Sequence, residues 1–314
     1  MISTNHPSSM SVTDSASPEI QRAPRSFWSD AWRQFRRQRT AIFGLLVLGV
    51  LILGTSLGPF VYAQEPSTID FSLKRKPPSL EHPFGTNDLG QDQLARALLG
   101  GRISIAVGLA AVMVSISLGI LIGATAGYFG GHVDNWLMRF TDLFLSLPFM
   151  PVLLMTIYLF RDALRGPFGP QMGIFILIVV LIGGFHWMPV ARIVRASFLS
   201  LKQTEFVEAA RCIGVQTHQI ILRHILPNVL SPVIVAATLG VGSAIIAEST
   251  LSFLGLGFPP DFPTWGRMLF DAQNYLELSP HMAFFPGLLI SLAVLSINYV
   301  GDGLRDALDP RRKT

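Results

Sequence analysis

Few residues in this chain are placed as catalytic residues usually are. The sequence has no H-E-x-x-H motif, no C-x-x-C pair and no Gly-rich dinucleotide motif,. None of its lysines follows a glycine, so a P-loop for ATP phosphates is absent,. The histidines are scattered over different segments and Cys212 is the one cysteine, so neither a metal site nor an internal disulfide is expected,. We therefore predict that this chain is not an enzyme and holds no cofactor of its own.

One polar stretch stands between two long apolar runs. It is Glu205–Asn228, with the sequence EFVEAARCIGVQTHQIILRHILPN. Phe206–Cys212 consists largely of helix formers, and Gly214 suits a turn or a helix cap,. Ile220–Ile225 resumes an apolar helix that Pro227 would end or bend,. The stretch is predicted to form a helix, a turn and a second helix.

The first of these helices has the features of a docking segment. Ala209 and Ala210 would offer a small surface that another protein can approach closely, and Glu208 would add a charge,. The residues alone leave an alternative, in which the stretch is a solvated loop stabilised by Glu208 and Arg211 at i, i+3,.

The composition places these residues in an integral membrane protein. Half of the 314 residues are hydrophobic, 14% are charged, and the mean hydropathy is positive,. A helix needs about 20 apolar residues to cross a bilayer, and six runs are long enough. These runs are continuous rather than alternating, so an all-α fold with six transmembrane helices is predicted. The expected spans are approximately Ala41–Ala63, Ile103–Gly127, Leu143–Phe160, Met172–Val190, Val229–Phe258 and Met282–Val300.

The charge distribution predicts the orientation. Six spans put both termini on one side, and segments on that side hold about two thirds of the 24 Lys and Arg residues,. Arg33, Arg36, Arg37 and Arg39 directly precede the first span, where the positive-inside rule applies most strongly,. Both termini are therefore expected in the cytoplasm. The remaining loops include an external loop at 64–102 and a cytoplasmic loop at 191–228.

The N-terminal region divides into two expected parts. Residues 1–24 are rich in Ser, Thr and Pro without an apolar face, which is typical of a disordered cytoplasmic tail,. Residues 25–40 have aromatic side chains at helical spacing with arginines between them, which favours an amphipathic interfacial helix in contact with membrane lipid,. The alternative is a frayed, aromatic-rich start of the first span. The transmembrane domain would then cover residues 41–314.

The polar stretch resembles a loop of the inner-membrane permease subunits of ABC importers. That loop carries Glu-Ala-Ala, then Gly four positions after the second Ala, and Leu-Pro about a dozen residues further on. The sequence RHILPN, in which His224 replaces the usual Ile, is similar to the dipeptide and oligopeptide branch of the family. Three further stretches resemble the same branch: His82–Asp92, Ser249–Gly257 and Asp306–Arg311. The matching loop residues are Glu208, Ala209, Ala210, Gly214, Leu226 and Pro227.

This resemblance implies a mechanism and a set of partners. The loop helix would be a coupling helix seated in a cleft of an ATP-binding subunit, whose closure rocks the transmembrane bundle. The implied assembly has this chain, a homologous second permease, two ATPase subunits and an extracytoplasmic binding protein in a bacterial inner membrane. ATP and Mg²⁺ would be bound by the ATPase subunits, and nucleic acid is not an expected partner. The implied cargo is a dipeptide or oligopeptide, with a nickel chelate or a glutathione-like peptide as the alternative.

Glu248 is the one acid inside the predicted spans. An acid in an apolar span is costly and suggests a function by default, such as attracting a substrate amino group,. It could equally lie at the outer interface and bond to Ser249 or Thr250. A secondary transporter would use several such groups and show internal repeats, and neither is apparent here,. An ATP-driven importer is therefore favoured over that class, and over a membrane enzyme.

Overall fold

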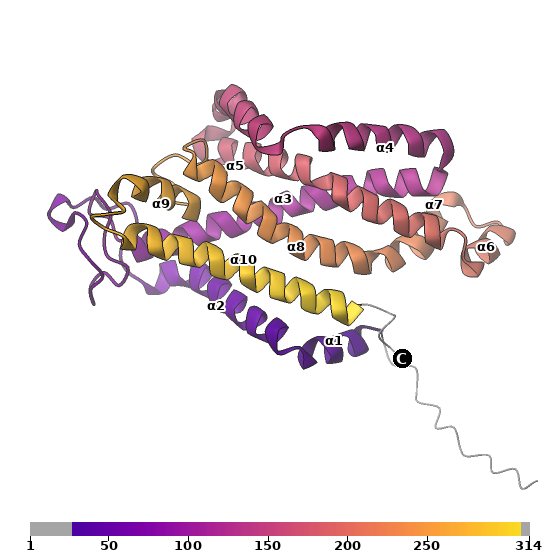
Figure 1. Cartoon of the computed structure of the whole chain (residues 1–314), viewed down its shortest axis with the longest axis horizontal. Helices are drawn as coiled ribbons and strands as arrows, with labels where there is room; N and C mark the ends of the chain where they lie inside the picture. The colour runs from indigo at the N-terminus through magenta and orange to yellow at the C-terminus, as the bar shows by residue number, and fades with distance from the viewer. Residues whose placement is uncertain (1–26, 309–314) are drawn as a thin grey trace, which may run out of the picture.

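The computed structural model describes residues 27–308 and is a bundle of long helices (Figure 1). Within those residues the helices are joined by loops, and the β structure is a single isolated bridge between Thr86 and Asp92. The predicted all-α fold is confirmed. The expected tail at residues 1–24 lies outside the described range, as does the end of the chain beyond Leu308. The helices are α1 (Phe27–Arg37), α2 (Arg39–Val61), η1 (Phe71–Leu73), α3 (Gln93–Phe129), α4 (Gly131–Ser146), α5 (Phe149–Leu201), α6 (Glu205–Cys212), α7 (Thr217–Gln219), η2 (Ile220–Ile225), α8 (Leu226–Phe253), α9 (Trp265–Ala272), η3 (Gln273–Tyr275) and α10 (His281–Leu308).

Five of the six predicted runs correspond to continuous membrane-spanning helices, and the remaining run, the third, corresponds to a bent pair of helices. Among the described residues, five continuous helices are long and apolar enough to cross a bilayer,. A sixth candidate is a bent pair, Gly131–Ser146 with Phe149–Leu164, whose two parts meet at 83°. The bundle therefore has six spans if this pair is counted as one. The continuous spans are Arg39–Val61, Gln93–Phe129, Gly166–Leu201, Thr217–Phe253 and His281–Leu308.

The third predicted span, Leu143–Phe160, is divided between two helices. The chain leaves the helical conformation at Leu147, whose ψ of 136° is extended. The cause is Pro148, because the proline ring disfavours the helical conformation of the residue before it and Pro148 has no N–H to donate. Residues on the two sides of this break belong to α4 and α5. A second break occurs inside α5 at Gly169, where φ is 79°.

Three loop boundaries also differ from the prediction. The external loop ends earlier than residue 102, because the Asp92 carboxylate accepts from the Ala95 N–H at 2.7 Å and starts α3 at Gln93,. The cytoplasmic loop predicted at 191–228 is shorter, since α5 continues to Leu201 and the next span begins at Thr217. The fifth span ends at Phe253 rather than Phe258.

Helices α3 and α5 pack against each other most extensively in the bundle. Gly119, Gly123 and Gly127 form a stripe on α3 at intervals of one helical turn. A Cβ added at Gly119 would lie 2.6 Å from Val190, and one at Gly127 would lie 2.6 Å from Phe198. Because no side chain larger than hydrogen fits, these glycines set the close contact between the two helices. The stripe therefore serves packing within this chain.

The bundle has two distinct ends (Figure 1). Helices α1, α6 and α7 lie at one end, together with the C-terminal end of α10. The loop after α2 and helix α9 lie at the opposite end. The polar stretch that resembles a coupling loop therefore shares its end with the N-terminal helix.

Candidate functional site

Helix α6 turns one face towards the bundle and the other towards solvent. Val207 is fully buried and Ala210 is 5% exposed, and both pack in a cluster with Phe198 of α5. The cluster continues into Ile220 and Ile225 of η2, so α6 rests on the ends of the spans that flank it. The i, i+3 spacing of Val207 and Ala210 keeps them on one side of the helix, and this anchors a helix too short to be stable alone.

An exposed face beside this anchored one carries three apolar residues. Phe206 and Ala209 of α6 and its C-cap residue Ile213 are spaced at i, i+3 and i+7, which places them along one face,. Ala209 is exposed, Phe206 is 44% exposed and Ile213 is 81% exposed. We call these three residues the docking face. Glu208 is also exposed, on a different side of the helix from Phe206,.

Gly214 ends α6 in a left-handed conformation with a φ of 79°. The Val215 N–H donates to Ala210 O at 3.0 Å, and the Gly214 N–H donates to Arg211 O at 3.0 Å. These two bonds define a Schellman cap, in which a glycine is favoured because other residues resist a positive φ. Val215 then packs on the cluster that holds Ala210. Gly214 therefore fixes the direction in which the chain leaves α6.

Leu226 and Pro227 lie where the polar stretch joins the fifth span. The preceding residues, Ile220–Ile225, form a π-helix, and the Leu226 N–H donates to Ile221 O. Pro227 cannot donate a hydrogen bond to the turn before it, and the wider π-helical turn accommodates this loss. Leu226 is half-buried against the cluster, whereas Pro227 is exposed. The pair shapes the joint and does not belong to the docking face.

Three of these placements change the sequence-based picture. Ala210 is buried, so the expectation that it contributes exposed surface is wrong, and its role is to support α6. The pairing of Arg211 with Glu208 is replaced by a contact of the Arg211 guanidinium with the Tyr128 ring, 5.7 Å from its centroid,. Sequence reasoning missed Phe206 and Ile213, although their spacing around Ala209 was a usable signal.

Basic residues fasten the segment before α6 to neighbouring helices. Lys202 Nζ donates to Gly127 O at 2.9 Å, at the C-terminal end of α3, where a positive charge is favourable,. Arg195 of α5 forms a two-point ion pair with Asp134 of α4, with its Nη2 2.6 Å from Oδ2,. These contacts connect the C-terminal part of α5 and the residue after it, which lead into α6, to α3 and α4.

Glu248 is fully buried near the C-terminal end of α8 and faces α3. Ser252 Oγ donates to its Oε1 at 2.7 Å, and Ser104 Oγ donates to its Oε2 at 3.1 Å. Ser104 Oγ also accepts from the Trp265 N–H at 3.3 Å, so the network joins α3, α8 and α9. The expected bond with Thr250 is not formed, since Thr250 Oγ1 donates to Ile246 O of its own helix. This arrangement favours a structural role for Glu248 over contact with substrate.

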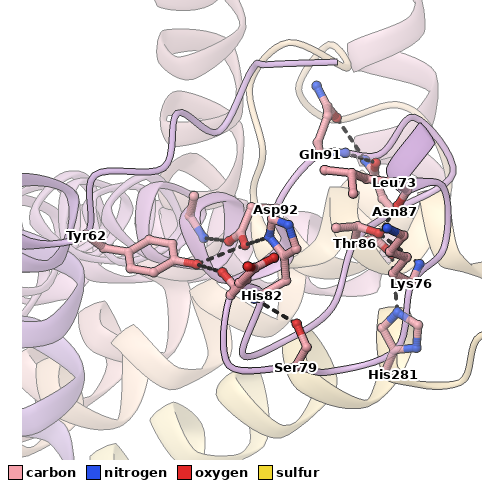
Figure 2. A network of polar contacts seen from close by, with 12 residues as sticks. Tyr62, Leu73, Lys76, Ser79, His82, Thr86, Asn87, Gln91, Asp92 and His281 are labelled. Carbon is pink, nitrogen blue, oxygen red and sulfur yellow. Dashed lines mark hydrogen bonds and ion pairs between the residues drawn. The ribbon is translucent and has the colours of Figure 1, made fainter. Parts of the chain in front are cut away.

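The stretch His82–Asp92 folds into a polar network at the end opposite α6 (Figure 2). Figure 2 shows the Asp92 carboxylate between the Tyr62 and His82 side chains. Asp92 Oδ2 accepts from Tyr62 Oη at 2.9 Å and lies 2.8 Å from His82 Nδ1. Burial, reinforced by Asp92, raises the pKa of Tyr62 above its ordinary value, so the phenol stays a proton donor,. This network fixes the loop between α2 and α3.

No group of three or more His, Cys, Asp or Glu side chains within residues 27–308 is arranged to hold a metal ion. The polar groups described above are committed to hydrogen bonds and ion pairs that hold the fold together. The docking face of α6, by contrast, is left open to another molecule.

Comparison with known proteins defines the class to which this fold and this loop belong. Residues 119–314 match the family described as binding-protein-dependent transport system inner membrane component. Residues 26–78 match the N-terminal transmembrane domain of oligopeptide transport permease C. The chain belongs to the binding-protein-dependent family of inner-membrane transport permeases.

The similarity to individual relatives extends over nearly the whole chain. The oligopeptide transport system permease protein OppC of Haemophilus influenzae is 41% identical over 93% of this chain and 91% of its own length. The dipeptide transport system permease protein DppC of Alkalihalophilus pseudofirmus is 36% identical over 96% of this chain and 95% of its own. The glutathione transport system permease protein GsiD of Escherichia coli is 36% identical over 94% and 93%.

A solved structure supports the fold independently. A chain of the MetNI methionine ABC transporter in an inward-facing conformation superposes with a TM-score of 0.52. The match covers 67% of this chain and 94% of that one, at 18% sequence identity. At this identity the likeness establishes the fold shared by the two chains.

Proposed function

We propose that this chain is the permease subunit of an ATP-driven importer that carries peptides across a bacterial inner membrane. The observation that carries this proposal is helix α6, which is anchored by the buried Val207 and Ala210 and leaves the docking face exposed beside them. An apolar strip of this size on a short, capped helix suits insertion into a groove of a partner protein.

The packing of α6 suits the transmission of movement. A force on the docking face reaches Val207 and Ala210, and from there Phe198 of α5 and Ile225 at the start of the fifth span. The Schellman cap at Gly214 keeps the helix from swivelling on its loop,. Closure of a partner on α6 would therefore displace the inner ends of two spans together.

The proposed partners follow from the family and from the missing nucleotide motif. Two ABC ATPase subunits would bind ATP and Mg²⁺ and would dock one on this chain and one on a homologous second permease. An extracytoplasmic binding protein would deliver the cargo at the end that carries α9. The end that carries α6, together with α1 and the C-terminal end of α10, would then face the cytoplasm,.

The proposed cargo is a dipeptide or oligopeptide, supported by the names of the OppC and DppC relatives and by the N-terminal domain match. Glutathione is the second candidate, because the GsiD relative is similar over the same length. Both cargoes are short peptides with free termini, which explains why permeases of similar sequence serve them.

An uptake assay on the reconstituted assembly tests the proposal. Vesicles that contain this chain, its co-encoded second permease and ATPase subunits should take up the ligand of the co-encoded binding protein only when ATP is supplied. A labelled tripeptide should be imported, and excess glutathione should not compete with it. The chain alone should neither hydrolyse ATP nor import peptide. Uptake by the chain alone, driven by a proton or sodium gradient, would contradict the proposal.

A further inference from the structure

Helix α1 is held in one orientation against the C-terminal part of α10. Ala31 and Phe35 are buried in a cluster with α10 residues, and Gly303 leaves the space that Phe35 occupies. Gln34 Nε2 donates to Asp306 O at 2.8 Å, and this polar contact adds a directional restraint to the apolar packing. The direction in which the other side of α1 points is thus set by the fold.

That other side carries a positively charged hollow. Three arginines, one serine and one tryptophan line an open depression of about 420 Å³. These residues recur at helical spacing on one face, and the acid of α1, Asp30, is not among them. Within residues 27–308 the three guanidinium groups have no hydrogen-bond or ion-pair partner, although all three are exposed. The lining residues are Ser29, Trp32, Arg33, Arg36 and Arg37.

The hollow lies next to the start of an apolar candidate span. One residue, Gln38, separates α1 from α2, which is an apolar span beginning at Arg39. Trp32 is 54% exposed and stacks on Phe35, with ring centroids 5.8 Å apart. An exposed tryptophan beside arginines at the end of a span is the arrangement found at the boundary between headgroups and acyl chains.

We propose that this hollow binds the headgroup of an anionic phospholipid. Arg33, Arg36 and Arg37 would contact the phosphate oxygens, for which the guanidinium donor geometry is well matched. Trp32 would lie against the glycerol and upper acyl chain. The positive charge of the hollow favours a headgroup with a net negative charge over a zwitterionic one, because its lining has three unpaired guanidinium groups and no carboxylate,. The proposal requires α2 to span a membrane and is independent of the coupling role of α6.

Lipid titration of the delipidated full-length chain, followed by native mass spectrometry, tests this site. Phosphatidylglycerol should bind more tightly than phosphatidylcholine of the same acyl chains. Replacing one arginine by glutamine should weaken phosphatidylglycerol binding about five-fold, and R33Q/R36Q/R37Q should weaken it by considerably more than tenfold. Inorganic phosphate at millimolar concentration should not displace the lipid, because it lacks the acyl chain that Trp32 contacts.

The chain offers a matched control at its opposite end. Lys74, Arg75 and Lys76 are three consecutive exposed basic residues, so K74Q/R75Q/K76Q removes the same charge away from α1. This variant should keep the phosphatidylglycerol preference. Equal losses of phosphatidylglycerol binding in the two triple variants would show that only the net charge of the chain matters, and would overturn the proposal. It would also be overturned if R33Q/R36Q/R37Q kept its lipid preference but lost binding to the purified ATPase subunit, which would assign the arginines to a protein contact.

Discussion

At the scale of single residues, Glu248 shows how burial decides between two interpretations of an acid in an apolar span. Its carboxylate is enclosed by hydroxyl donors from α3 and α8 and is fully buried. Such a group is retained when its partners are satisfied, and its removal leaves those partners without an acceptor. Through these hydrogen bonds Glu248 links α8 to α3.

Glu248→Ala should therefore destabilise the protein. The hydroxyls of Ser104 and Ser252 would lose their acceptor, at a cost of about 1–3 kcal/mol for each buried unsatisfied group,. Thermal unfolding in detergent should show a lowered midpoint, while the exposed-acid control Glu205→Ala should leave it unchanged. An unchanged midpoint in Glu248→Ala, together with a raised half-saturation constant for peptide uptake, would instead place this side chain on the substrate path.

Gly214→Val should loosen the coupling segment. Its φ of 79° costs a non-glycine residue about 1–3 kcal/mol, and a β-branched side chain resists it most,. Protease cleavage between Lys202 and Gln216 should become faster without loss of membrane insertion. Gly49→Val is the control, because that glycine is helical and has open space around it. Equal cleavage rates in the two variants would show that the positive φ does not matter.

At the scale of elements, the sequence predicted that the helices exist better than it predicted their bends and their exact ends. The extended residue before Pro148 in the third span follows from proline sterics,. The 83° bend between α4 and α5 depends on how the two parts pack on the bundle, which local sequence does not encode. The same holds for Asp92, whose capping role lengthened α3 beyond the apolar run that predicted it.

Asp92→Ala tests how the outer loop is held. The substitution removes the N-cap of α3, worth about 1 kcal/mol, and leaves Tyr62 Oη without its carboxylate acceptor,. The loop between α2 and α3 should exchange amide hydrogens faster and the unfolding midpoint should fall. Asp88→Ala removes a nearby acid of the same loop and should change neither. Unchanged exchange in Asp92→Ala would mean that the loop is held by other contacts.

At the scale of the whole molecule, the two ends of the bundle carry the topological prediction. Reporters fused after Gln64 or Pro260 should report the outside, because both positions belong to the end opposite α6,. A reporter after Thr217 should report the cytoplasm. An external signal at Thr217 would contradict both the orientation and the coupling role, whatever the cargo is.

The sequence was sufficient for the class of fold and indicated the segment that holds the candidate site, because apolar length and motif spacing are local properties. It could not separate Ala209 from Ala210, since adjacent helical residues differ only in which face the bundle covers. It also could not show that Glu248 meets Ser104, a residue far away in the chain. Contacts between distant segments require the packed structure.

The measurement that tests the central claim most directly is a paired ATPase pull-down and peptide-uptake assay on Ala209→Trp. The exposed tryptophan should block docking of α6, so that pull-down and uptake both fall by about tenfold or more while insertion persists,. Ala63→Trp, at another exposed alanine, should behave as the unchanged chain. Normal pull-down and normal uptake in Ala209→Trp would contradict the account and leave α6 as an ordinary solvated loop helix.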